Sequence, residues 1–111
     1  MMAHWMYLAL SIVTEVAGTT SMKLSEGFTK PVFTALIFIF YGVSFYFFSQ
    51  TIKRMDLGTA YAIWAGLGTA LIALIGVVYF RDGLDMIKAI SLMAIIAGVI
   101  GLNLSGSHGG A

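Results

Sequence analysis

One carboxylate stands within an otherwise uncharged segment, "SIVTEVAGTT", at residues 11–20. On an α-helix, Ser11, Gly18 and Thr19 would share a face with this acid, Glu15, because residues three and four positions apart are neighbours. A charged side chain in the middle of a membrane is costly unless it is paired, hydrated or protonated, and such residues mark functional sites by default. The segment predicts a site where a proton and an organic cation compete for Glu15, and this competition would couple their movements.

Other kinds of chemistry find little support in the chain. The histidines are His4, at the edge of a predicted span, and His108, in the C-terminal tail, and neither a Ser-His arrangement nor paired carboxylates are evident. Cysteine is absent, which excludes disulfides, zinc-thiolate sites and thiol nucleophiles. Without a phosphate loop or a ligand cluster, we expect no enzyme, metal, ATP or prosthetic group. The structural alternative for Glu15 is a hydrogen bond that only holds helices together, which Asn or Gln would make at lower cost.

Aromatic side chains that could surround a cation occur in two later segments. "YGVSFYFF" places Tyr41, Ser44 and Phe45 on one helix face, and "YAIW" places Tyr61 and Trp64 one turn apart. Aromatic faces attract cations, more strongly where water is excluded. A carboxylate with these side chains nearby predicts a binding cage for a hydrophobic or quaternary cation. Phenylalanines in such a run also suit a lipid-facing surface, so both interpretations of Phe45 stay open.

The composition identifies the environment of these residues. Hydrophobic residues make up 59% of the 111 residues and charged residues 10%, whereas soluble domains carry about 25% charged residues. Ten of the eleven Lys, Arg, Asp and Glu residues fall in three short clusters, separated by uncharged runs long enough to cross a bilayer. We therefore predict an all-α membrane protein, a single domain of four transmembrane helices. The predicted helices are residues 5–22, 32–51, 57–80 and 86–104, followed by a disordered tail at 105–111.

Two glycines lie in the middle of the third predicted span. Gly66 and Gly68 belong to "WAGLG", and close packing and a kink both explain glycines at such a position. Their place beside Trp64 favours a hinge, because alternating access requires a helix that bends.

Small residues recur along the fourth predicted span at intervals of three and four. They are Ser91, Ala94, Gly98 and Gly101. Such a seam lets helices approach closely in lipid, either within one chain or between two. One chain is too small to enclose a pathway, so we expect a homodimer in which two copies of Glu15 surround a shared site and titrate as a coupled pair.

Charge gives weak guidance on orientation. Four basic residues lie in the first and third loops and two in the second, so a single biased topology and insertion both ways round remain open. The net charge of +1 gives no case for nucleic acid as a partner.

Three motifs resemble one known family. "TEVAGTTSMKLSEGFTK", "GTAYAIWAGLGTALI" and "AIIAGVIGLNL" are similar in order and spacing to the small multidrug resistance (SMR) family, over nearly the whole chain. The resemblance implies a proton-coupled exporter of organic cations that works as an antiparallel homodimer of oppositely inserted copies. It also implies that Glu15 is the shared proton and substrate site, that Tyr41, Tyr61 and Trp64 bind substrate, and that the glycines of the third span form a kink. We expect a multi-pass protein of the cell's inner (plasma) membrane, with lipid around it and the small-residue seam at its dimer interface.

Two positions bear on the substrate. Gly18 stands where guanidinium exporters of the family typically carry Trp, so the chain resembles the quaternary-ammonium and multidrug branch. Ser11 departs from the Ala or Gly common there, and its hydroxyl is expected to reach the carboxylate and affect substrate preference. The alternatives are a narrower exporter of guanidinium, polyamine or choline-like compounds, and a membrane scaffold or partner subunit of a paired transporter that does not itself transport.

Overall fold

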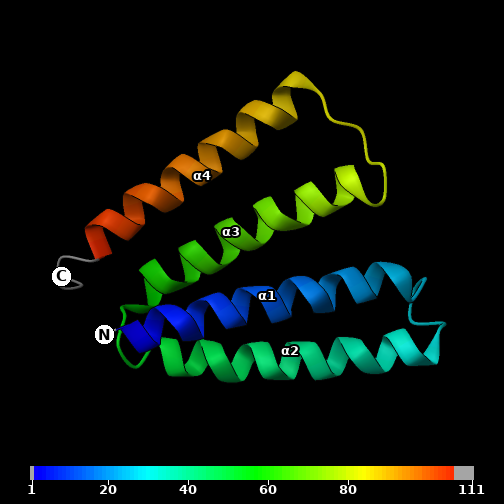
Figure 1. The fold of residues 1–111 in the computed structure, drawn as a ribbon, viewed down its shortest axis with the longest axis horizontal. Helices are drawn as coiled ribbons and strands as arrows, with labels where there is room; N and C mark the ends of the chain where they lie inside the picture. The colour runs from blue at the N-terminus through cyan, green and yellow to red at the C-terminus, as the bar shows by residue number, and fades with distance from the viewer. Residues whose placement is uncertain (1, 107–111) are drawn as a thin grey trace. The chain divides into compact units, whose positions relative to one another are not determined.

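The computed structural model describes residues 2–106, which form four α-helices and no strand (Figure 1). The predicted all-α architecture with four helices is thereby confirmed. The helices are α1 (Met2–Leu24), α2 (Pro31–Thr51), α3 (Leu57–Val78) and α4 (Met86–Gly106). The predicted disordered tail was wrong at residues 105 and 106, which continue α4; the remainder of that tail, 107–111, lies outside the described residues.

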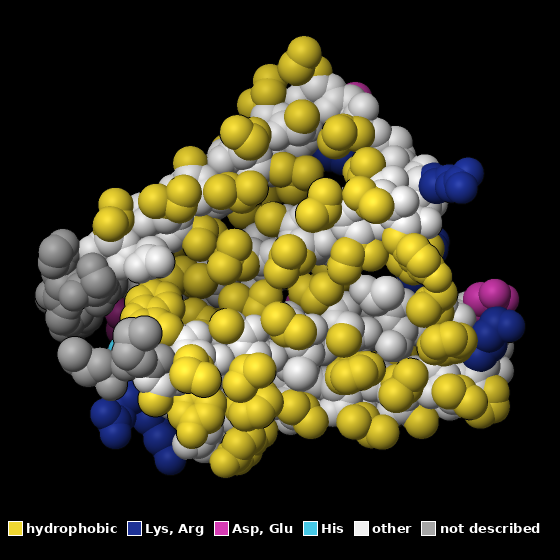
Figure 2. Space-filling model, viewed as in Figure 1, with side chains coloured by type: hydrophobic (Ala, Val, Ile, Leu, Met, Phe, Trp, Pro, Cys, Tyr) yellow, Lys and Arg dark blue, Asp and Glu magenta, His cyan; other side chains and the backbone are white. Residues whose placement is uncertain are grey.

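Three of the helices are long and apolar enough to cross a membrane. These candidate spans are Pro31–Thr51, Leu57–Val78 and Met86–Leu104. At 23 residues, α1 is also long enough, since about 20 residues of helix cross the hydrocarbon core. Figure 2 shows apolar side chains along the middle of the helices and charged ones near helix ends. The helix α1, which carries Glu15, is not among the three candidate spans. Its role as a membrane span stays a prediction.

The chain divides into two compact units between Arg54 and Met55. The first unit is a hairpin of α1 and α2, whose core includes the buried side chains of Leu8, Ile12 and Ile37. Its turn contains Gly27 with a φ of 75°, in the left-handed region that glycine adopts without strain. Pro31 then begins α2, where its missing N–H costs no helical hydrogen bond.

The second unit is a hairpin of α3 and α4. Asp56 caps α3 by accepting a hydrogen bond from the Thr59 N–H at 3.0 Å, and Asp85 caps α4 by accepting one from the Lys88 N–H at 2.7 Å. The helix α3 ends at Val78 rather than at the predicted residue 80. Beyond it the chain turns back, and the Asp82 N–H donates to the Gly76 carbonyl at 2.8 Å.

Candidate functional site

Glu15 belongs to a chain of three hydrogen-bonded side chains. The Thr19 hydroxyl, one turn further along α1, donates to Glu15 Oε2 at 2.8 Å. The Tyr41 hydroxyl, on α2, lies 2.6 Å from Thr19 Oγ1. A threonine hydroxyl carries one proton, which is already given to Glu15, so Tyr41 must be the donor to Thr19. Both hydroxyl protons therefore point toward the carboxylate, and Thr19 links the acid of α1 to the phenol of α2.

Gly18 provides the space in which the Tyr41 ring lies. A Cβ atom at Gly18 would lie 2.7 Å from both Cδ1 and Cε1 of Tyr41, much closer than carbon atoms approach in folded proteins. Gly18 shares a helix face with Glu15, as its spacing predicts, and the Tyr41 ring occupies the space beside it. The missing side chain allows Tyr41 to reach Thr19, and through it the acid.

Ser11 does not bond the carboxylate, and that expectation was wrong. Its hydroxyl donates to the Ser44 carbonyl at 2.9 Å, and the Ser44 hydroxyl donates to the Ser11 carbonyl at 2.7 Å. Both serines are fully buried. Each side chain thus satisfies a backbone carbonyl of the other helix, and this reciprocal pair, which we call the serine clasp, joins α1 to α2. The roles of both serines in substrate binding stay predictions.

The predicted aromatic residues form one group in each hairpin. Tyr41 stacks on Phe45 with ring centroids 6.3 Å apart, and Phe45 is exposed on the hairpin surface. On α3, Tyr61 and Trp64 are tilted against each other with centroids 5.6 Å apart. The structure therefore brings Tyr41 to the Glu15 chain of hydrogen bonds, while Tyr61 and Trp64 make an aromatic pair of the second unit. Phe45 retains both of its interpretations.

The glycines of α3 lie in a continuous helix. Both Gly66 and Gly68 fall inside Leu57–Val78. A Cβ atom at Gly66 would lie 2.7 Å from Val99 Cγ2 and 3.4 Å from Ile95 Cγ2, so this glycine lets α4 approach α3 closely. Close packing, one of the two readings of these glycines, is therefore realised at Gly66. A hinge at Gly66 and Gly68 stays a prediction.

The small-residue seam of α4 faces away from α3. Its members, Ser91, Ala94, Gly98 and Gly101, are all exposed. A Cβ atom at Gly98 or Gly101 would meet no atom within 4 Å in the described part of the chain. Because α4 contacts α3 through Ile95 and Val99, on another face, the seam is not used for packing within this hairpin.

Sequence reasoning placed Glu15, Gly18 and Thr19 on one face but missed two contacts. It did not predict that Thr19 links the acid to Tyr41, nor that Ser11 pairs with Ser44. The four-residue spacing of Glu15 and Thr19 indicates the hydrogen bond between them. The contacts with α2 depend on how the two helices align. Among residues 2–106, no group of His, Asp and Glu side chains is arranged to hold a metal ion.

Comparison with known proteins identifies the family of this chain. The family model described as Small Multidrug Resistance protein matches residues 3–95. The uncharacterized membrane protein YvaE of Bacillus subtilis (strain 168) is 48% identical, over 91% of this chain and 85% of YvaE. The quaternary ammonium compound-resistance protein QacG of Staphylococcus sp. (strain ST94) is 45% identical, over 95% of this chain and 99% of QacG. The multidrug resistance protein EbrB of Bacillus subtilis (strain 168) is 44% identical, over 93% of this chain and 88% of EbrB. Since the family model covers most of the chain, this protein belongs to the Small Multidrug Resistance family.

Proposed function

We propose that this protein exports hydrophobic and quaternary ammonium cations in exchange for protons. The observation that carries the proposal is Glu15, an acid within a helix of a membrane protein, hydrogen-bonded through Thr19 to the aromatic Tyr41. The family is one of transporters rather than enzymes, and relatives such as QacG and EbrB are named for quaternary ammonium and multidrug resistance. Neither a metal nor another cofactor takes part, because the proton gradient supplies the energy.

The mechanism follows from competition for one carboxylate. An ionised Glu15 attracts an organic cation, and the Tyr41 ring supplies a face that also attracts positive charge. A proton that reaches Glu15 removes the negative charge, so the cation loses its electrostatic partner and leaves. Occupation by a proton and by a cation therefore alternate, and movement of one down its gradient drives the other outward.

The proposal includes an antiparallel homodimer in the plasma membrane. The exposed seam of α4 supports self-association, because small residues allow close helix contact in lipid and α3 does not cover them. Two copies would place two Glu15 side chains around one site. A Gly98→Leu variant should then lose the dimer in chemical crosslinking, since a leucine would hold the facing helices apart.

The environment of Gly18 supports the multidrug branch over guanidinium export. The Tyr41 ring fills the position that a side chain at Gly18 would take. A tryptophan there, as in the guanidinium branch, would displace Tyr41 and rebuild the site. A broad aromatic surface beside the acid suits larger, hydrophobic cations.

The test is proton release from purified protein on addition of tetraphenylphosphonium. We expect release from the unmodified protein and none from Glu15→Gln. The matched control is Glu26→Gln, which removes the other glutamate of the same hairpin, a largely exposed side chain 3.9 Å from the Lys30 ammonium. Equal release from the unmodified and Glu15→Gln proteins would contradict antiport. In proteoliposomes with a proton gradient, uptake of guanidinium but not tetraphenylphosphonium would favour the narrower exporter, and uptake of neither would favour a scaffold.

A further inference from the structure

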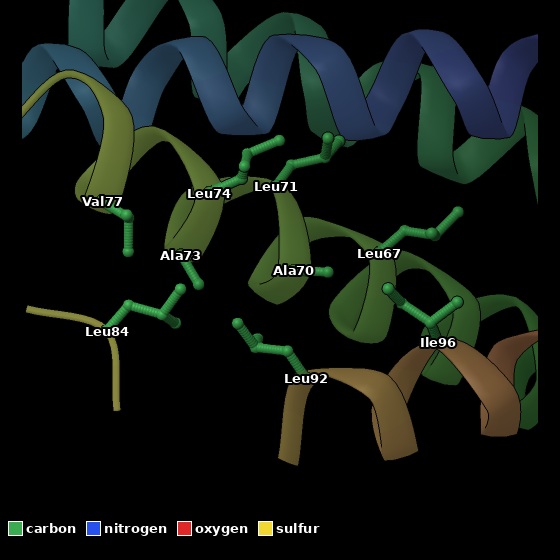
Figure 3. Close-up of a pocket in the computed structure, with 9 residues that line it drawn as sticks. All are labelled: Leu67, Ala70, Leu71, Ala73, Leu74, Val77, Leu84, Leu92 and Ile96. Atoms are coloured by element: carbon green, nitrogen blue, oxygen red, sulfur yellow. The ribbon is translucent and has the colours of Figure 1, made fainter. Parts of the chain in front are cut away.

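A hollow of about 350 Å³ lies between α3 and α4 (Figure 3). Its lining consists entirely of leucine, isoleucine, valine and alanine side chains. Figure 3 shows Ala70 and Ala73 of α3 on one side, with Leu92 of α4 and Leu84 of the connecting segment across from them. The hollow thus presents a hydrocarbon surface without a polar group to orient a drug-like ligand.

The hollow arises from the way the two helices separate. They are held closely at Gly66, where Val99 Cγ2 would lie 2.7 Å from a Cβ atom. From there toward the connecting segment 79–85 the helices of this hairpin diverge (Figure 1). The alanines Ala70 and Ala73 are too small to fill the widening space opposite Leu92.

The size and chemistry of the hollow suit one acyl chain. Protein interiors are close-packed, and water does not occupy purely apolar cavities. From Leu67 to Val77, the first and last α3 residues of the lining, the helix rises about 15 Å at 1.5 Å per residue. One leaflet of the hydrocarbon core is also about 15 Å thick. The hollow is therefore as long as the hydrocarbon part of a leaflet.

The connecting segment has the features of a lipid headgroup region. Tyr79 is 65% exposed and meets Phe80 edge to face, with centroids 4.9 Å apart, and tyrosines are enriched at the level of the headgroups. Arg81 is exposed three residues before Leu84, which lines the hollow. The Lys88 ammonium donates to the Gly83 carbonyl, which leaves two N–H groups of this cation for another acceptor.

One of the two acids of the segment is hydrogen-bonded to backbone through its carboxylate. Asp85 accepts the Lys88 N–H at 2.7 Å and so caps α4. The Asp82 carboxylate lies directly against the backbone of α3 at Gly76. Together with the first turn of α4, the segment holds as many acids as bases, but only Arg81 and Lys88 carry side-chain N–H groups that can donate to a phosphate, and they lie three residues before and four residues after Leu84, which lines the hollow.

We infer that this hollow binds one acyl chain of a glycerophospholipid, with the phosphate of the headgroup held by Arg81 and Lys88. Arginine and lysine bind phosphate through charge-assisted hydrogen bonds. The seam residues of α4 are not among those that line the hollow, so a second copy docked on the seam would use other side chains. The inference concerns a lipid site and does not depend on the transported substrate.

The experiment is a lipid titration of delipidated full-length protein, followed by native mass spectrometry. We expect one tightly held palmitoyl-oleoyl phosphatidylglycerol per chain. Diacylglycerol with the same acyl chains should bind about tenfold more weakly, because it lacks the charged acceptor, and Arg81→Gln should reduce this difference. The double variant Ala70→Phe, Ala73→Phe should lose the tight lipid, because its rings fill the hollow. Ala97→Phe, on an exposed position of α4 outside the lining, is the control and should keep it.

A second measurement needs no variant. Phosphatidylglycerol with a diazirine in its acyl chain should, on irradiation, label the unmodified protein in residues 67–77 and 92–96. Labelling confined to other parts of the chain would overturn the site. Equal lipid retention by the double variant and the unmodified protein would do the same. Absence of tightly held lipid from the unmodified protein would also overturn the inference. Equal binding of diacylglycerol and phosphatidylglycerol would refute the phosphate contact.

Discussion

The two hairpins of this protein differ in what joins their helices. In the α1–α2 hairpin, side-chain hydroxyls form hydrogen bonds between the helices at two places. One is the serine clasp and the other is the contact of Thr19 with Tyr41. In the α3–α4 hairpin, the closest contact is the apolar approach of Val99 to Gly66, and a hollow opens beside it. Lipid supplies no hydrophobic force between helices, so packing and hydrogen bonds hold them together.

This difference fits the tasks proposed for the two hairpins. The polar contacts of the first hairpin fix where Tyr41 lies relative to Glu15, which a binding site requires. The apolar second hairpin leaves a seam and a hollow exposed, and these suit association with a second helix and with lipid. The hydrogen bonds of the α1–α2 interface hold side chains in fixed positions, whereas the α3–α4 hairpin leaves apolar surfaces that a second helix or a lipid can contact.

The largest effect of a single substitution is expected at Gly18, where α1 meets the Tyr41 ring of α2. Gly18→Ala places a methyl group against the Tyr41 ring, so the ring must move and its bond to Thr19 is lost. Overpacking of this kind costs about 1–3 kcal/mol. We expect a lower free energy of unfolding in detergent and much weaker tetraphenylphosphonium binding. Gly42→Ala is the control, because a Cβ atom there meets nothing within 4 Å in the described structure. Equal losses in both variants would show that Tyr41 is not held by Gly18.

The serine clasp is expected to give the next largest effect. In a double-mutant cycle of Ser11→Ala and Ser44→Ala, the two substitutions should be non-additive, with a coupling of about 0.6–1.7 kcal/mol, the range for hydrogen bonds between membrane helices. The free energy of unfolding in mixed micelles measures this coupling. Ser49→Ala is the control, since that hydroxyl bonds only within its own helix, to the Tyr46 carbonyl. Strict additivity would mean that the clasp does not join the helices.

A smaller effect is expected from Tyr41→Phe, which keeps the ring and removes the hydroxyl that donates to Thr19. One neutral hydrogen bond is worth about 1 kcal/mol, so the dissociation constant of tetraphenylphosphonium should rise about fivefold. Tyr46→Phe, on an exposed position of the same helix, should leave it unchanged. Equal binding by the two variants would contradict a role for the Tyr41 hydroxyl, since the stacking surface alone would then account for binding.

The smallest effect concerns the polar contacts of the second hairpin, which lie at its helix ends. Hydrogen bonding from Thr59, from its side chain and then its backbone N–H, holds the pKa of Asp56 below its usual range. The stability this contributes is present above the ordinary carboxyl pKa and is lost as the pH falls through the lowered value. Asn caps helices as well as Asp but does not titrate. Asp56→Asn should therefore match the unmodified protein at neutral pH and lose less thermal stability near pH 3. Identical acid profiles would show that this cap does not contribute.

The sequence predicted the elements well because charges end membrane helices. Clusters of Lys, Arg, Asp and Glu marked the three connections, and the uncharged runs between them became helices. The end of α3 was misplaced because Arg81 adopts a left-handed conformation, with a φ of 61°, that no residue type there announces. Spacing along one helix sufficed for Glu15 and Thr19, which are one turn apart.

Contacts between helices were harder to predict. The serine clasp depends on how α1 and α2 align, and an isolated helix does not determine that alignment. The hollow depends on the angle at which α4 leaves α3, which no pattern in the sequence encodes. Ser11 was therefore assigned to the acid, its neighbour along the helix, when its hydrogen-bond partner lay across the interface.

The two polar contacts of the first hairpin also determine where residues can be inserted or deleted without disturbing it. A residue inserted in α1 between Ser11 and Thr19 would rotate one contact by about 100° relative to the other, since a helix turns once in 3.6 residues. Either the clasp or the bond to Tyr41 would then be lost. An insertion in the turn at residues 25–30 disturbs neither, because both contacts lie within the helices. Variation in length among working versions of this hairpin should therefore be confined to its turn.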